Sequence, residues 1–426
     1  MSENENSKKL ENFFNTLVDQ SIGPTNAYYY PFLEESISDP IAELASRIKF
    51  SASESVNLFS GQSGCGKSTE LKRLKQILQQ QGCEVFLLDM REYINLRTPI
   101  EISDFLISIM TAFSEKVELS YSHAPAKRGY LERLNDFLHQ DVNLENMGVK
   151  VGVGDIKASL KSDPTFKQRL QDSLQGHAAK IVSDAHVFAQ DTVSFIRQET
   201  KDSNKKIVLL IDSVEQIRGV GADNSDKVHK SVANLFSGHS EGLKIPMLHI
   251  VYTIPPYLTA LAPGVGRQLG GAMACTLPSI HVQNKDNSID PKGLEIMRTL
   301  ISKRYSEWQH FFTPDQLDLL AESSGGDIRD FFRLIQAALV KTGNRIPIPD
   351  LVIEQAQNHL RREMMPIAND DKQWLQEIEE NKKANLGSIE KLPDLARLFD
   401  NKLVLNYRNG DDWYGVHPLL KDEIKE

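Results

Sequence analysis

Residues 61–68 have the spacing Gly-x4-Gly-Lys-Ser, and these residue types suit the binding of a phosphate chain. Glycines let the backbone turn so that successive amide N–H groups point at phosphate oxygens. Lys67 supplies a compact positive charge, and Ser68 supplies a hydroxyl group, a hard oxygen ligand of the kind that Mg²⁺ prefers. An apolar run precedes the loop and a helical pattern follows it, and a helix N-terminus also attracts phosphate.

The sequence therefore predicts a phosphate-binding loop that continues into a helix. The residues expected to contact the phosphates are Gly61, Gln62, Ser63, Gly64, Cys65, Gly66, Lys67, Ser68 and Thr69. Among them, Cys65 is expected to contribute mainly its backbone, because its small side chain is one that the loop tolerates.

A second candidate group follows the apolar run 207–211, which ends at Asp212. Ligands of open parallel sheets bind beyond the carboxyl ends of the strands, so Asp212 is expected to reach Mg²⁺ through a water molecule. An aspartate after an apolar strand is common by itself, and the upstream phosphate loop is what makes this one a metal-site candidate. Ser68 and Asp212 together predict a site for Mg²⁺.

Five apolar runs must position these groups. Helical patterns separate the runs, which predicts an α/β fold with a parallel sheet covered on both faces. The fourth run is expected to lie between the first and third in the sheet. The runs are residues 55–61, 83–90, 205–212, 245–254 and 272–282.

The remaining patterns predict how the chain is divided. The alternating stretch 148–161 indicates a small hairpin, and Asn409-Gly410 between two apolar runs is a strong hairpin signal. A helix followed by such a hairpin is typical of a winged helix. The expected parts are an N-terminal helical segment (1–25), an α/β core (26–290) with a helical insertion (about 123–200), a helical lid (291–347) and a winged-helix-like domain (348–426).

Composition narrows the setting. The chain has 426 residues, 40% hydrophobic and 25% charged, with a formal net charge of -9, which repels nucleic acid at long range. Three scattered cysteines (Cys65, Cys83, Cys275) form no metal-binding pattern and suit a reduced compartment. No run of about 18 apolar residues and no apolar signal segment is found, so a cytoplasmic protein without a membrane span is expected.

The order of these elements resembles the origin-recognition-type branch of the AAA+ ATPases and the related STAND ATPases, over residues from about 30 to the C-terminus. Three segments are also similar to bacterial ATP-binding proteins that often occur in anti-phage defence loci: "LLIDSVEQI", "GGDIRDFFRL" and "VLNYRNGDDWYGVHPL". The resemblance implies an AAA+-type core with ATP and Mg²⁺ as cofactors. It also implies a nucleotide-driven conformational or assembly switch that works as a homo-oligomer, with an effector protein, or both.

The resemblance assigns roles to three further residues. Thr253, at the end of the fourth predicted strand, matches the polar residue called sensor 1, although such a threonine is also ordinary in a sheet. Arg329 in Gly-Asp-Ile-Arg matches sensor 2, whose guanidinium forks onto phosphate, although it could instead pair with Asp327 or Asp330. Arg267 lies where an arginine finger acts on a neighbouring subunit, although a loop arginine is often only solvated.

The chain departs from the family at the position after Asp212, where Ser213 replaces the usual glutamate. Glu215 could orient the attacking water, or it could be a helix N-terminal acid that interacts with the helix dipole. Hydrolysis is therefore expected to be slow. Tyr29 and Tyr30 could stack on the adenine or pack in the core.

Two alternatives to the switch stay open at this point. One is an initiator-like ATPase that binds DNA through its winged helix; residues 381–426 contain as many acidic as basic residues, and Asp411 and Asp412 lie at the hairpin turn, which does not favour it. The other is a scaffold that binds the nucleotide without hydrolysing it.

Overall fold

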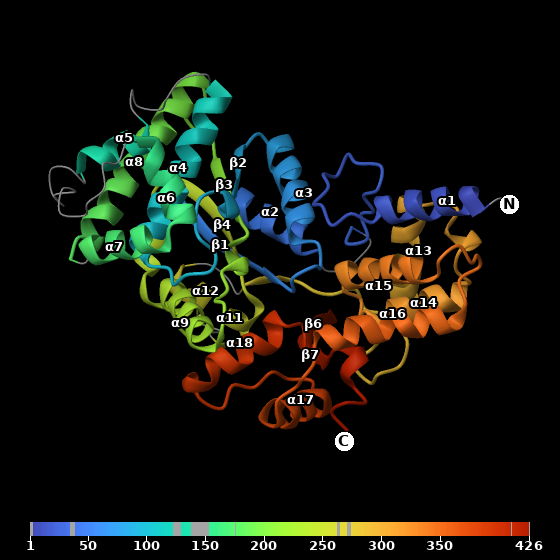
Figure 1. Ribbon diagram of the computed structural model, residues 1–426. Helices are drawn as coiled ribbons and strands as arrows, with labels where there is room; N and C mark the ends of the chain where they lie inside the picture. Colours follow the sequence, from blue (N-terminus) through green and yellow to red (C-terminus); the bar gives the residue numbers. More distant parts are fainter. Residues whose placement is uncertain are drawn as a thin grey trace. The chain divides into compact units, whose positions relative to one another are not determined.

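The computed structural model describes residues 3–34, 39–121, 129–137, 153–174, 176–261, 265–270, 274–409 and 411–425. The chain forms two compact units (Figure 1). The first, here called the lid unit, comprises Met1–Pro40, Gly61–Lys72 and Thr276–Glu426. The second, the sheet unit, comprises Ile41–Ser60 and Arg73–Cys275.

A five-stranded sheet has the order β2-β3-β4-β1-β5, and the pairs β1/β4, β2/β3 and β3/β4 are parallel. Its strands are β1 (Ser55–Gly61), β2 (Glu84–Asp89), β3 (Ile207–Asp212), β4 (Leu248–Ile254) and β5 (Cys275–Leu277). Every residue of β3 and β4 is buried, as expected for strands covered on both faces. The α/β fold with a parallel sheet is confirmed, and so is the place of the fourth strand between the first and third.

Helices α4 and α8 lie side by side in the sheet unit, and α4 also packs on β2 (Figure 1). Because α4 is covered in this way, it is buried almost without interruption from Ile102 to Ser114. The helices of this unit are α2 (Pro40–Phe50), α4 (Ile102–Tyr121), α5 (Tyr130–Phe137), α6 (Val153–Ser162), α7 (Pro164–Leu174), α8 (Ala178–Glu199), α9 (Ala222–Gly238), α10 (Ser240–Leu243), α11 (Pro256–Leu261) and α12 (Val265–Gln268). Helix α3 (Lys67–Gln80) begins in the lid unit and continues here.

The hairpin expected at 148–161 is wrong for the part that the structure describes. Val153–Ser162 is helix α6, and residues 148–152 lie outside the described residues. Leu160 is buried, and α6 packs on α7 and α5. Tertiary packing therefore outweighs the local alternation of residue types.

The insertion is held on α4 by a buried ion pair. The Lys167 ammonium of α7 lies 3.0 Å from Asp104 Oδ2, and both side chains are almost fully buried. The same ammonium donates to Thr98 Oγ1 at 3.0 Å and to the Pro99 carbonyl at 2.7 Å. Gln171 Nε2 donates to the other carboxylate oxygen at 3.2 Å, so each carboxylate oxygen of Asp104 has a polar neighbour.

The lid unit contains a helical core that includes the N-terminal helix. Leu10, Phe13 and Leu17 are buried in it, and Phe13 stacks on Tyr305 with ring centroids 4.6 Å apart. Helix α1 therefore packs on this core through these apolar side chains, while Phe14 is exposed. The helices of this unit are α1 (Glu3–Thr16), α13 (Pro291–Arg304), α14 (Pro314–Ser323), α15 (Ile328–Lys341), α16 (Asp350–Glu363), α17 (Asn369–Asn381) and α18 (Leu392–Asp400).

The C-terminal hairpin is present where Asn409-Gly410 predicts it. Strands β6 (Val404–Asn409) and β7 (Asp411–Val416) are antiparallel, with Val404 opposite Val416, and α18 precedes them. The winged-helix assignment and the four-part division of the chain stay predictions. None of the helices in the described part of the chain has both the length and the apolar character needed to cross a membrane.

We predict that Lys167→Ala lowers the free energy of unfolding by about 3–5 kcal/mol, because it leaves the Asp104 carboxylate buried without its cation. The double variant Lys167→Met/Asp104→Asn removes both charges and should recover most of this loss. Urea-unfolding midpoints measure both effects, with Lys161→Ala on exposed α6 surface as the control. Equal midpoints for Lys167→Ala and the double variant would contradict the prediction.

Candidate functional site

The phosphate loop connects β1 to α3 and has the curled backbone that its glycines predict. Gly64 and Gly66 have φ values of +102° and +103°. Lys67 is buried, and its ammonium donates to the carbonyls of Gly61 at 2.9 Å and of Gln62 at 3.0 Å. The lysine charge therefore lies folded over the loop, where a phosphate would meet it.

Within the lid unit, the start of α15 packs closely on this loop. A Cβ atom at Gly64 would lie 2.6 Å from Asp327 Oδ1 and 2.8 Å from the Cβ of Arg329. Together with the left-handed φ, this contact restricts the position to glycine. The start of α15, which carries both residues, therefore lies directly against the loop.

The hydroxyl groups after the lysine have different surroundings. Ser68 is partly buried, and no hydrogen bond engages its hydroxyl within the described residues. Thr69 Oγ1 accepts a hydrogen bond from the Ile22 amide at 3.3 Å. Cys65 is buried, so its backbone is the part that can face a ligand.

No cluster of three His, Cys, Asp or Glu side chains among the described residues could hold a metal ion by itself. Mg²⁺ that is bound to phosphates needs only one or two protein ligands.

Arg329 joins the loop to the N-terminal segment. Its Nη1 donates to Ser63 Oγ at 3.0 Å, and its Nε lies 2.7 Å from Asp19 Oδ2. The guanidinium thus lies at the loop, and the sensor role of Arg329 stays a prediction. Its partners are Ser63 and Asp19, whereas Asp327 and Asp330 pair with Lys402.

The carboxylates at the start of α15 form a buried ionic cluster with the C-terminal region. Lys402 Nζ lies 2.9 Å from both Asp327 Oδ1 and Asp330 Oδ2, and both aspartates are fully buried. His417 Nε2 lies 4.0 Å from Asp330 Oδ2. Burial raises the pKa of Asp327, although Lys402 acts against this shift. Burial also lowers the pKa of His417 to about 3, with a further contribution from Lys402.

Gln62 connects the loop itself to the C-terminal region. Its side chain is 1% exposed, and its Nε2 donates to the carbonyls of Phe399 at 2.8 Å and of Val404 at 3.1 Å. Phe399 belongs to α18 and Val404 begins β6. The Gln62 side chain therefore links the loop directly to α18 and β6.

Three backbone groups on the outer edge of β6 are hydrogen-bonded to other parts of the lid unit. After Val404, the Asn406 carbonyl accepts from the Ser279 amide at 3.0 Å, and the Arg408 amide donates to His281 Nε2 at 3.1 Å. On the hairpin's own face, Tyr407 donates to the Gly325 carbonyl at 2.7 Å. The hairpin is thus bonded to the loop, to the segment after β5 and to the start of the lid helix α15.

The second group of predicted site residues lies in the sheet unit. Asp212 Oδ1 accepts from the Ser213 amide at 2.8 Å, and Ser213 has a left-handed φ of 71°. Thr253 Oγ1 accepts from the Val214 amide at 3.1 Å. The threonine therefore supports the turn that carries Glu215, which lies in the 3₁₀ turn Val214–Gln216.

Sequence reasoning missed Asp89, which is the last residue of β2, and Arg91, which follows that strand. Asp89 pairs in register with Asp212 on β3. Burial opposes ionisation of Asp89, but hydrogen bonds from Arg91 and Ser213 lower its pKa below the ordinary value. The hydrogen bond to Asp89 raises the pKa of Arg91, and Asp212 and Glu215 add to this effect. The sequence did offer a signal for this pair, because the second apolar run also ends near an aspartate, as the third run does.

The structure gives separate surroundings for three other residues named in the sequence analysis. Arg267 falls in α12, and its side chain lies outside the described residues. Tyr30 packs against the helical core of the lid unit. Tyr29 donates from its hydroxyl to Glu70 Oε1 at 3.1 Å. Asp19, Lys402 and His417 were not predicted, because their partners are distant in sequence.

Comparison with known proteins gives weak likenesses. No protein-family model and no curated protein matches the chain. The ORC2 protein of Aeropyrum pernix in its ADP form is 13% identical, with 96% of this chain and 95% of that one covered and a TM-score of 0.38. Cdc6p of Pyrobaculum aerophilum is 11% identical over 94% and 96%, with a TM-score of 0.39. The Walker-type ATPase PABY2304 of Pyrococcus abyssi is 12% identical over 92% and 96%, with a TM-score of 0.35. Because these TM-scores are low, we draw no conclusion about the fold from them beyond the strand order described above.

We predict that the free energy of unfolding falls as the pH is lowered from 6.5 towards 3, because the unfolded chain then protonates His417 while the folded chain keeps it neutral beside Lys402. His417→Asn keeps an acceptor for the Leu419 amide. Its stability should depend less on pH in this window, by at most about 1.4 kcal/mol per pH unit. Urea midpoints at several pH values test this, and parallel pH profiles for the two proteins would refute it.

Proposed function

We propose that the chain is an AAA+-type ATPase that binds ATP with Mg²⁺ at the phosphate loop and acts as a nucleotide-driven switch. The observation that carries this proposal is the buried Gln62 side chain, which bonds the loop to α18 and β6. A loop that only held phosphate would have no need of such a connection. The connection makes the C-terminal region responsive to the state of the loop.

The loop supplies the binding chemistry of the proposal. Amides of residues 61–69 surround the phosphates, and Lys67 leaves the loop carbonyls to neutralise them. Ser68 and Asp212 are the residues that would hold Mg²⁺, because their oxygen atoms are the hard ligands that this ion prefers. Tyr29, beside Glu70, is the candidate for stacking on the base.

Hydrolysis in this proposal is slow. Ser213 offers no carboxylate to orient the attacking water, so Glu215 takes this task, with Thr253 fixing the turn that carries it. Arg329 contacts the terminal phosphate from the lid, as its place at Ser63 supports. Arg267 acts on a neighbouring subunit once copies assemble.

The output of the switch is assembly, with further copies of the chain, with an effector protein, or both. The similarity of three segments to ATP-binding proteins of anti-phage defence loci supports a role as the ATPase component of such a system in the bacterial cytoplasm. The hairpin serves as a packing element in this proposal: Arg408 pairs with Asp412 at 3.8 Å, which leaves it less suited to contact phosphates of DNA.

We predict that Lys67→Ala abolishes ATP binding measured by calorimetry, because the loop loses the charge that neutralises the phosphates. Lys75→Ala, on the same helix and away from the loop, should bind ATP as the unaltered protein does. Equal ATP affinity in the Lys67 variant would remove the basis of the proposal.

We predict that Gln62→Glu weakens the attachment of the hairpin, because a carboxylate cannot donate to the Phe399 and Val404 carbonyls and repels them instead. Hydrogen exchange of residues 404–409 should then be faster without nucleotide, and assembly should need less ATP. Gln76→Glu on α3 is the matched control. Unchanged exchange in the Gln62 variant would show that the loop does not hold the hairpin.

A further inference from the structure

A segment of the lid unit, here called the strap (residues 17–30), runs from α1 along the start of α3. Lys72 Nζ donates to the carbonyl of Ser21 at 2.6 Å and to its hydroxyl at 2.8 Å. The Ile22 amide donates to Thr69 Oγ1 at 3.3 Å. At the other end, the Leu17 carbonyl accepts from Gln336 of α15 at 3.3 Å. The strap therefore bridges the lid helix and the helix that follows the phosphate loop.

The strap places the negative charge of Asp19 beside Arg329, which contacts the loop. Asp19 Oδ2 lies 2.7 Å from Nε of Arg329, and the same guanidinium donates to Ser63 of the loop. The carboxylate thus occupies, at an arginine beside the loop, the kind of place that a phosphate oxygen takes. Both side chains are substantially exposed, at 64% for Asp19 and 38% for Arg329, so the pair can exchange its partners readily.

We propose that Asp19 is an internal competitor for Arg329: a nucleotide phosphate displaces its carboxylate, and residues 18–22 of the strap lose their ion pair with α15. This inference rests on the proposed function and adds the regulation of the same site. A triphosphate presents several negative charges, and a guanidinium binds phosphate oxygens in a bidentate fashion, so the exchange favours the nucleotide. Asp19, left without its cation, is then repelled from the loop.

The release changes what holds the first half of the strap. Without the Asp19 pair, the hydrogen bonds with Lys72 and Thr69 are those that tie residues 18–22 to the rest of the described chain. Helix α1 stays packed in the helical core through Phe13. Nucleotide binding therefore loosens a defined stretch and leaves the N-terminal helix in place.

We predict that Asp19→Asn binds ATP about two- to fivefold more tightly, the range that an exposed ion pair supports. The gain should shrink as salt is raised, because salt screens the charges. Glu11→Gln removes an acid from the same N-terminal region without touching Arg329 and should leave the affinity unchanged. Calorimetry over a salt series gives the affinities.

Hydrogen exchange of the peptide that covers residues 17–24 gives a readout that does not depend on affinity. In the unaltered protein its exchange should rise on addition of ATP. In Asp19→Asn it should be fast already without nucleotide, and in Arg329→Gln it should be fast with or without ATP. Asp19→Glu keeps the charge and should retain the response to ATP.

The outcomes separate this inference from the proposed function. If the unaltered protein binds ATP but Asp19→Asn binds it equally or more weakly, the competitor is wrong and the ATP site stands. If hydrogen exchange of the strap changes neither on addition of ATP nor in Asp19→Asn, the proposed release of the strap is wrong, and the ATP site still stands. If the unaltered protein binds no ATP, both proposals fail.

Discussion

The structure depends on the buried amide of Gln62, which bonds a glycine-rich loop to two carbonyls of the C-terminal region. Removing one member of a buried hydrogen-bonded group leaves its partners without water or protein to satisfy them, at a cost of about 1–3 kcal/mol. The loop backbone and the α18–β6 connection are therefore constrained to move together or to separate at that cost.

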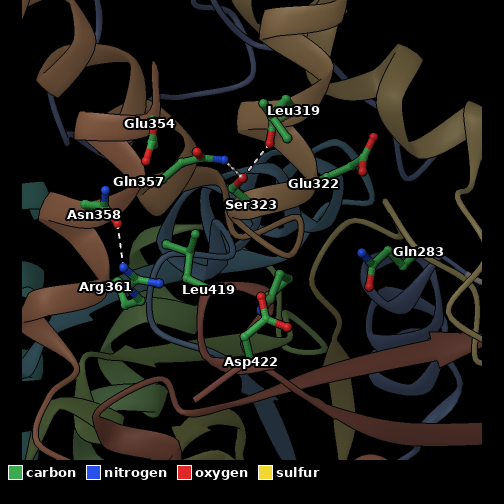
Figure 2. A pocket seen from close by; sticks show the side chains of 11 residues that line it. Gln283, Leu319, Glu322, Ser323, Glu354, Gln357, Asn358, Arg361, Leu419 and Asp422 are labelled. Atoms are coloured by element: carbon green, nitrogen blue, oxygen red, sulfur yellow. Dashed lines mark hydrogen bonds between the residues drawn. The ribbon is translucent and has the colours of Figure 1, made fainter. Parts of the chain in front are cut away.

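Charged residues at the start of α15 also connect the loop with the C-terminal region. Lys402 lies between Asp327 and Asp330 at the start of α15, and Arg329 in the same turn reaches the loop. Consecutive residues of one helix start thus face two different parts, the C-terminal region and the loop. The pocket in Figure 2 lies elsewhere in the lid unit, where residues of α14 and α16 such as Glu322 and Gln357 face Leu419 and Asp422.

Local patterns predicted the parts of this site that local physics determines. Glycine spacing predicted the curled backbone of the loop, buried β-branched runs predicted the strands, and the Asn409-Gly410 pattern predicted the antiparallel pairing of β6 with β7. The partners of Lys402 and Arg329 could not be predicted, because pairing between residues far apart in sequence is set by packing. Helix α6 shows the same limit for secondary structure, since alternation at its start was overruled by the helices beside it.

The bonded outer edge of β6 has a consequence of its own. Gln62, Ser279 and His281 bond three of the backbone groups that a two-stranded ribbon would otherwise leave without a partner. A hairpin detached from them would present an open row of donors and acceptors, and such a row readily recruits a strand from another molecule. Detachment would thus expose a strand edge that can pair with another chain. The attached hairpin keeps this edge bonded and so protects the protein against aggregation.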